Sequence, residues 1–224
     1  MSVKVFVLGR SGSGKTTVAR RIVELAKSRE YKARRMKDYH LLFKMYQEDT
    51  NGDNFQPAAY GGFQVTNYTV FDRALEELEE DVTRKISEDT EEIVTIEFAR
   101  GSYHDAFLKF SPDFIQNAYF FFIDAGVETC IERISQRVTD PPTSDHHYVP
   151  DEIMRRYFDK DNWFYMANKF KNDYNISKEV VLYHNTGSIE ELYAQVDRFT
   201  ETIFTNEFSA TKPEVTRALE ESVV

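Results

Sequence analysis

The sequence predicts an α/β protein, in which a parallel sheet is covered by helices on both faces to form a three-layer sandwich. Short apolar segments of strand length recur along the chain, and segments with the apolar spacing of helices separate them. Strands that alternate with helices form βαβ units, and such units build a parallel sheet. The 224 residues suffice for one large domain, which we place at residues 1–207, with residues 208–224 as a C-terminal tail.

The first strand is expected at residues 3–8, where β-branched and aromatic residues dominate. A glycine-rich loop and a helical stretch at residues 16–28 follow it. A second, more highly charged strand is expected at residues 31–36. Residues 37–67 are irregular and rich in Tyr, Phe, Gly and Asn, so that we expect loops there and one helix near residues 40–47.

The second half of the chain continues the alternation of helices and strands. Apolar residues at helical spacing, with acids between them, predict an amphipathic helix over residues 68–86. Further strands are expected at residues 92–98, 119–123 and 179–184. Further helical segments are expected at residues 102–116, 127–138, 151–158, from residue 189 onward, and at 213–222. The order of the strands in the sheet does not follow from their spacing.

Composition and charge narrow the classes of function. Lys and Arg number 28 against 38 Asp and Glu, which gives a net charge of −10. A net acidic surface disfavours general binding of nucleic acid or of an anionic membrane, but it allows a local basic pocket. The single cysteine, Cys130, excludes an intramolecular disulfide and a cysteine-based zinc cluster. No apolar run approaches the ~20 residues of a membrane helix, and the N-terminus lacks a complete signal peptide. We therefore expect a soluble, cytoplasmic protein, whose oligomeric state stays open.

The strongest functional signal follows the first strand. Residues 9–16, GRSGSGKT, match the pattern G-x-x-x-x-G-K-[ST] in full. Glycines let successive backbone N–H groups curl around phosphate oxygens, and the helix that begins near Lys15 adds its positive end. Lys15 can reach the β- and γ-phosphates, and the Thr16 hydroxyl can ligate Mg²⁺. Nucleotide phosphates are therefore expected to contact Gly9, Ser11, Gly12, Ser13, Gly14, Lys15, Thr16 and Thr17.

Other parts of the chain restrict the kind of nucleotide-binding protein. A GTPase carries an Asn-Lys-x-Asp motif that reads the base, whereas residues 168–171, NKFK, lack the aspartate and do not follow an apolar strand. No LSGGQ-type run is present, which excludes transporter ATPases. The chain is also too short for most motor or remodelling ATPases. Small-molecule kinases remain.

Three further features, taken with the phosphate loop, carry a resemblance to a known family. Residues 130–137, CIERISQR, place one arginine a helical turn before another. Residues 185–188, NTGS, follow the last strand, and Glu97 ends the third. From residue 3 to about residue 200 the chain resembles the nucleoside/nucleotide kinase-like P-loop kinases, which include the adenylate, dephospho-coenzyme A and gluconate kinases.

This resemblance implies several properties of fold and site. The fold would be a P-loop NTPase sandwich around a five-stranded parallel sheet. A helical lid would occupy residues 133–158, and an insertion at residues 38–69 would bind the acceptor. Asn185 and Gly187 would hold the adenine of ATP.

Arginines in the expected lid are candidates for binding the transferred phosphoryl group. Arg133 and Arg137 are four residues apart and share a helix face. Two guanidinium groups there can neutralise the charge that develops during transfer, and both residues are therefore catalytic candidates. The alternative is a solvated helix face paired with neighbouring glutamates. Arg155 and Arg156 are weaker candidates for the far side of the lid.

Two acids and one further arginine complete the catalytic candidates. In several sugar and small-acid kinases of the family, a carboxylate placed like Asp38 contacts the acceptor hydroxyl as a base or orienting group. A helix N-cap is the alternative for Asp38. Glu97 is expected to hold Mg²⁺ through water, together with Thr16, and an ion pair with Arg100 is its alternative. Arg100 resembles the arginine that follows the acidic residue in nucleoside kinases, with a different spacing, and is a substrate-binding candidate.

Two other groups of residues have less specific patterns. His146 and His147 lie in the expected lid loop, where we expect a surface position, because adjacent histidines make a poor metal pair. Aromatic residues cluster where the family binds its acceptor, at Tyr39, Phe43, Tyr46, Phe55, Tyr60 and Phe63. They can stack on a planar acceptor or simply pack in the core. Gly61 and Gly62 are read as a hinge or a turn.

The sequence thus favours an ATP-dependent, Mg²⁺-using kinase that transfers the γ-phosphoryl group to a small-molecule acceptor. Lys15, Asp38, Glu97, Arg133 and Arg137 are its catalytic candidates. A regulatory protein that binds nucleotide but transfers little phosphate is one alternative. A toxin-type kinase acting on a nucleotide-sugar is another. The acceptor itself does not follow from the sequence.

Overall fold

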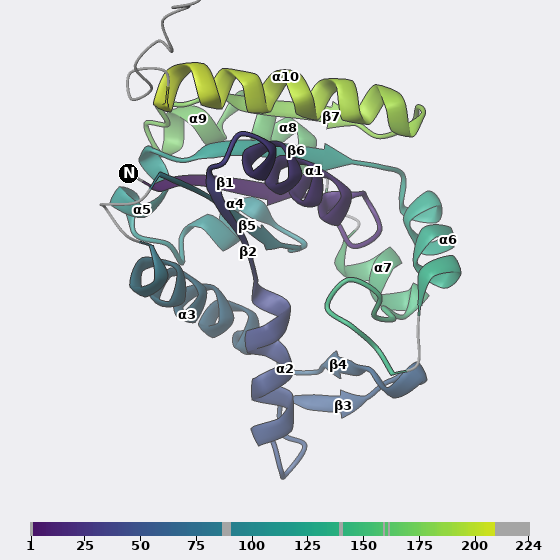
Figure 1. Ribbon diagram of the computed structural model, residues 1–224. Helices are drawn as coiled ribbons and strands as arrows, with labels where there is room; N and C mark the ends of the chain where they lie inside the picture. The colour runs from purple at the N-terminus through teal and green to yellow at the C-terminus, as the bar shows by residue number, and fades with distance from the viewer. Residues whose placement is uncertain (1, 87–90, 139–140, 159, 161, 209–224) are drawn as a thin grey trace, which may run out of the picture.

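The computed structural model describes residues 2–86, 91–138, 141–158, 160 and 162–208. Its centre is a five-stranded sheet in the order β2-β5-β1-β6-β7 (Figure 1). Every neighbouring pair of strands in this sheet is parallel. The strands are β1 (Ser2–Leu8), β2 (Lys32–Lys37), β5 (Glu92–Phe98), β6 (Tyr119–Asp124) and β7 (Val180–His184). The predicted α/β fold with a five-stranded parallel sheet is therefore confirmed.

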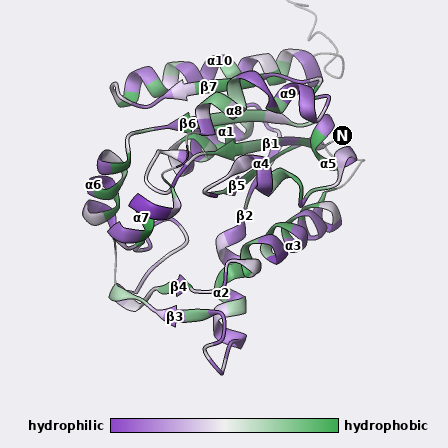
Figure 2. Cartoon of the chain, turned by 180° about the vertical axis from the view of Figure 1, so that it is seen from behind, coloured by the Kyte–Doolittle hydropathy of each residue, from purple (hydrophilic) through white to green (hydrophobic). Residues whose placement is uncertain are grey.

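Helices cover both faces of the sheet, because its central strands are apolar on both sides. On β1, Val5 and Val7 pack on one face, against α1 (Lys15–Ser28) and α10 (Ile189–Glu207). Phe6 and Leu8 alternate with them and face the opposite core. That core is closed by α3 (Thr69–Lys85), α4 (Tyr103–Phe107), α5 (Pro112–Gln116), α8 (Asn162–Asn168) and α9 (Phe170–Asp173). Figure 2 shows hydrophobic residues gathered on the central strands.

Two smaller units lie at the carboxyl ends of the strands. Helix α2 (Asp38–Glu48) continues directly from β2 and packs on a hairpin of β3 (Phe55–Pro57) and β4 (Phe63–Val65) (Figure 1). The other unit contains α6 (Val127–Arg137) and α7 (Asp151–Tyr157), which share a small apolar cluster. These units correspond to the expected acceptor region and lid, whose functional division stays a prediction.

Most predicted elements lie within one or two residues of the observed ones. The hairpin is a difference, because residues 49–67 were expected as loops; a short 3₁₀ turn, η1 (Ala59–Gly61), joins its strands. Gly61 and Gly62 belong to this turn, where the Gly62 N–H donates to the carbonyl of Ala59. Helices α8 and α9 were not predicted. The tail and its expected helix at 213–222 lie outside the described residues. In the described parts of the chain, no helix combines the length and apolarity that crossing a membrane requires.

Candidate active site

The phosphate loop joins β1 to α1, and its backbone requires glycine. Gly12 has φ +82°, and a Cβ there would lie 2.5 Å from the carbonyl oxygen of Cys130 on α6. The loop is fixed at both ends by buried side chains. The Tyr103 hydroxyl accepts a 2.6 Å hydrogen bond from the N–H of Gly9, and the Asn185 side chain donates a 2.7 Å bond to the carbonyl of Ser13. The loop is thus held in a curled conformation by the surrounding core.

Lys15 begins α1 and lines a cavity beside the loop. Its ammonium group donates a 2.9 Å hydrogen bond to the carbonyl of Arg10. Burial lowers the pKa of Lys15 to about 8, although the nearby carboxylate of Glu97 acts in the opposite direction. A buried ammonium group beside this glycine-rich loop is suited to bind phosphate oxygens.

The two predicted metal-binding residues meet at the end of the sheet. The Thr16 hydroxyl donates a 3.3 Å hydrogen bond to Glu97. One hydroxyl and one carboxylate fit Mg²⁺ that is also bound by nucleotide phosphates, since Mg²⁺ takes few protein ligands in such sites. In the described residues, no cluster of three or more His, Cys, Asp or Glu could hold a metal alone. Lys37 lies at the same point, 3.3 Å from the Thr16 hydroxyl and 3.7 Å from Glu97.

An ionic network connects this point to the expected lid loop. Asp145 accepts hydrogen bonds from Arg20 at 2.7 Å, from Arg35 at 2.9 Å and also from Lys37. Arg35 in turn donates a 2.9 Å bond to Glu97. Burial alone would raise the pKa of Asp145, but the bonds from Arg35 and Lys37 hold it well below its usual range. The lid loop is therefore anchored on β2 and α1 by a carboxylate that stays ionised.

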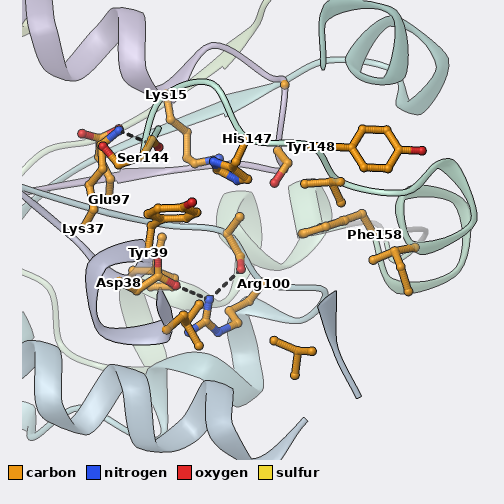
Figure 3. A pocket seen from close by; sticks show the side chains of 18 of the residues that line it. Lys15, Lys37, Asp38, Tyr39, Glu97, Arg100, Ser144, His147, Tyr148 and Phe158 are labelled. Carbon is orange, nitrogen blue, oxygen red and sulfur yellow. Dashed lines mark hydrogen bonds and ion pairs between the residues drawn. The ribbon is translucent and has the colours of Figure 1, made fainter. Parts of the chain in front are cut away.

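Asp38 and Arg100 form a buried ion pair on the floor of the cavity (Figure 3). The Nη1 atom of Arg100 lies 2.5 Å from an oxygen of Asp38, and its Nη2 atom donates a 3.0 Å hydrogen bond to the carbonyl of Phe71. The expected alternative pairing of Arg100 with Glu97 is wrong, because Glu97 is bound by Arg35. Asp38 is the first residue of α2 and not its N-cap, which is Lys37.

One cavity of about 160 Å³ extends from the phosphate loop to this ion pair and into an apolar region. Lys15, Thr16, Asp38, Glu97, Arg100 and Arg137 all line it, as do Ser11, Gly12 and Gly14. Four candidates from distant parts of the sequence, Asp38, Glu97, Arg100 and Arg137, therefore share one space with the loop. Among the expected aromatic residues, Tyr39 and Phe63 line the cavity, whereas Phe43, Tyr46 and Phe55 pack with Phe63.

His147 lies against this cavity and not on the surface, as its sequence context had suggested. Its ring stacks on Tyr39 with centroids 4.5 Å apart, and Figure 3 shows the two side chains together below Lys15. Burial, followed by the charge of Arg137, lowers the pKa of His147 to about 4. The imidazole is therefore neutral near pH 7.

Other candidates lie outside the cavity lining. Arg133 donates a 3.2 Å hydrogen bond to the carbonyl of Asn185. Because the Asn185 side chain binds the carbonyl of Ser13, Arg133 supports the phosphate loop indirectly. Gly187 directly precedes Ser188, the N-cap of α10, and a Cβ at Gly187 would meet a side-chain oxygen of Glu191. Adenine contacts of Asn185 and Gly187 stay a prediction. The expected far-side arginines pair with acids instead, Arg155 with Glu128 and Arg156 with Glu152.

Sequence reasoning missed Lys37, Asp145 and His147 as parts of the site. Lys37 ends the charged second strand beside Asp38, which was a usable signal. For Asp145 and His147 the only local signal was their place in a loop between two expected lid helices.

Comparison with known proteins supports the fold. No protein-family model and no curated protein sequence matches the chain. Kti12 from Chaetomium thermophilum, solved with ADP-AlF3, is 16% identical with a TM-score of 0.52, over 90% of this chain and 97% of that chain. The APS kinase CysC of Mycobacterium tuberculosis, solved with AMPPNP and APS, is 16% identical with a TM-score of 0.50, over 89% and 98%. Shikimate kinase from Acinetobacter baumannii, solved with shikimate, is 13% identical with a TM-score of 0.46, over 93% and 96%. The first two likenesses show that this chain shares the fold of Kti12 and of the APS kinase CysC.

Proposed function

We propose that the protein is an ATP-dependent kinase that transfers the γ-phosphoryl group to a hydroxyl group of a small acceptor. One observation carries the proposal: the phosphate loop and the buried Asp38–Arg100 pair line the same cavity. A γ-phosphate bound at Lys15 and an acceptor bound at Asp38 would therefore meet without a large movement of the core. Transfer requires little covalent chemistry from the protein, since positioning and charge neutralisation supply most of the catalysis.

Each lining group has a role in this reaction. Lys15 and Arg137 neutralise the charge on the phosphoryl oxygens. Asp38, held by Arg100, orients the acceptor hydroxyl and accepts its proton. Thr16 and Glu97 would hold Mg²⁺, which neutralises phosphate charge when it is bound. The loop at residues 141–150 covers the site and excludes the water that would otherwise hydrolyse ATP.

Lys37 adds a requirement to this proposal. Its ammonium group lies between Thr16 and Glu97 and is bound to Asp145. Mg²⁺ and an ammonium group cannot occupy the same point, so Lys37 must turn away when Mg·ATP binds. A lysine released there is placed to contact the transferred phosphoryl group instead.

The first test is ADP release from Mg·ATP across a panel of small acceptors. The panel contains nucleosides, nucleoside monophosphates, sugars, small acids, coenzyme precursors and neutral alcohols. We expect one acceptor class to raise turnover in wild type, and Lys15→Ala and Asp38→Asn to abolish this increase. Phe164→Ala, which removes an exposed aromatic ring on α8, is the matched control.

Other results would favour the alternatives. ATP binding without stimulation by any acceptor favours the nucleotide-binding regulator. Growth arrest on expression, lost in Lys15→Ala, together with turnover on nucleotide-sugars alone, favours the toxin-type kinase. Full acceptor-stimulated turnover in Lys15→Ala contradicts all three.

A further inference from the structure

The charges of the cavity are confined to its phosphate-loop end and its floor. Lys15, Lys37, Glu97, Arg137 and Asp145 surround the position of the phosphates. Asp38 and Arg100 neutralise one another on the floor.

The other described residues that line the cavity beyond this pair carry no charge, and they include Leu42, Gln64, Val65, Val149 and Ile153 as well as several aromatic residues. A carboxylate or phosphate buried among these side chains would lack a cation to pair with, which is unfavourable. The lining therefore selects against an acceptor with an anionic distal end.

Aromatic rings form a continuous wall next to the ion pair. The Arg100 guanidinium lies 4.5 Å from the centroid of the Phe71 ring. Phe71 stacks on Tyr68 at 5.9 Å with an interplanar angle of 10°, and Tyr157 lies within 5.4 Å of both rings. Figure 3 shows Tyr148 and Phe158 on the side of the cavity away from Lys37 and Glu97. Such a wall fits a flat ring by stacking or edge contacts.

The charged groups able to bind the acceptor are gathered at one point, the ion pair on the floor. Asp38 uses one carboxylate oxygen for Arg100, and no described residue donates a hydrogen bond to the other oxygen. Arg100 is only 4% exposed, and its Nε atom has no hydrogen-bond partner in the described residues. One carboxylate oxygen of Asp38 therefore stands unused on the floor, which suits one hydroxyl group. A sugar or polyhydroxy acid would place most of its hydroxyl groups against aromatic ring faces, which offer them few hydrogen bonds.

We infer that the acceptor is an uncharged aromatic alcohol, with its hydroxyl group at Asp38 and its ring against Tyr68, Phe71 and Tyr157. This inference rests on the proposed function and names its substrate class. In the reaction the acceptor oxygen forms a bond to the γ-phosphorus, and the bond from that phosphorus to the β-γ bridging oxygen breaks. The hydroxyl proton passes to Asp38 and then to solvent, and ADP leaves. ATP is the phosphoryl donor, and no oxidant or reductant takes part.

A matched pair of probe compounds tests the inference by calorimetric titration, both with and without ADP and Mg²⁺. The pair is p-methylbenzyl alcohol and p-(hydroxymethyl)benzoate, which differ by a methyl group against a carboxylate. Sorbitol serves as the neutral polyol. We expect the alcohol to bind at least about tenfold more tightly than the benzoate and than sorbitol.

Two variants test where the aromatic ring of the acceptor binds. Tyr68 is half exposed, so Tyr68→Ala should fold, and it should weaken binding of p-methylbenzyl alcohol by about two- to tenfold. Phe164 is similarly exposed outside the cavity, and Phe164→Ala should leave that binding unchanged. Equal or tighter binding of the benzoate or sorbitol overturns the inference. It is also overturned if the alcohol does not bind, or if both variants bind it as wild type does.

Failure of the proposed function has a different signature. If the alcohol binds as expected but receives no phosphate from Mg·ATP, the acceptor class stands as a ligand class and the kinase proposal fails. If ADP does not bind while the alcohol does, the nucleotide part of the proposal fails alone.

Discussion

Protonation of His147 is expected to release the lid loop from α2, where the His147 ring packs on Tyr39. The imidazole is packed on Tyr39 near the cations Arg137 and Lys15, and its Nδ1 atom is buried without a hydrogen-bond partner in the described residues. A positive charge at this point is unfavourable because of burial and because of repulsion from those cations. When the loop is undocked, the imidazole is exposed to water and has an ordinary pKa.

The size of the effect follows from the difference between the two pKa values. The pKa of His147 falls from 6.5 to about 4 on docking, which at ~1.36 kcal/mol per pKa unit corresponds to about 3 kcal/mol. Partial exposure of the loop reduces this to about 2 kcal/mol. Because docking favours the neutral form, its contribution is complete above pH 6.5. It declines as the pH falls and is lost once the pH passes below about 4. Asp145 stays ionised over this window, since its pKa is held below its usual range.

Hydrogen exchange of the backbone amides at residues 143–149 measures this change. After correction for the intrinsic pH dependence of exchange, protection should fall by about thirtyfold between about pH 7 and about pH 4.5. The decrease should disappear in His147→Gln. It should persist in His40→Gln, which removes an exposed histidine of α2. Constant protection in wild type, or an undiminished decrease in His147→Gln, would refute the reasoning.

Three further predictions concern the loop and its ionic network. Asp145→Asn should lower the free energy of unfolding by about 2 kcal/mol, because Arg35 and Lys37 lose the partly buried carboxylate that they share. An unchanged midpoint of urea denaturation would contradict this. Gly12→Ala should abolish ATP binding in calorimetry while the circular dichroism of the fold is retained, since a Cβ would lie 2.5 Å from the carbonyl oxygen of Cys130; wild-type affinity would disprove the close approach. Glu97→Gln should weaken ATP binding in Mg²⁺ by about tenfold and leave Mg²⁺-free binding no weaker, and an equal loss under both conditions would indicate a purely structural role.

The sheet and the phosphate loop can be predicted from the sequence because their signals are local. Strand β5 is buried along its whole length, and four of its seven residues are large and apolar. The phosphate loop combines a fixed spacing of glycines with a following helix. By contrast, β3 and β4 have three residues each, too few to show a strand period, and they pair because tertiary packing places them under α2. Helices α8 and α9 are similarly short.

The site is predictable only in part, for a related reason. Residues that end strands of a parallel sheet gather at one edge, which is why Lys15, Asp38 and Glu97 could be expected together. Their ion-pair partners could not be predicted. Lys37 and Asp145 are separated by 108 positions in the sequence and meet only because the lid loop folds back onto β2.

The contact between Gly12 and Cys130 gives the phosphate loop a built-in chemical reporter. The thiol is fully buried, burial raises its pKa, and the chain contains no other cysteine. A thiol-specific alkylating reagent therefore has a single target in the unmodified protein, and that target is shielded while α6 packs on the phosphate loop. The rate of alkylation measures how often α6 separates from the loop. If a nucleotide slows the alkylation of Cys130, the ratio of the two rates gives the free energy by which the bound nucleotide stabilises the contact between α6 and the loop. This measurement needs no label and no mutation.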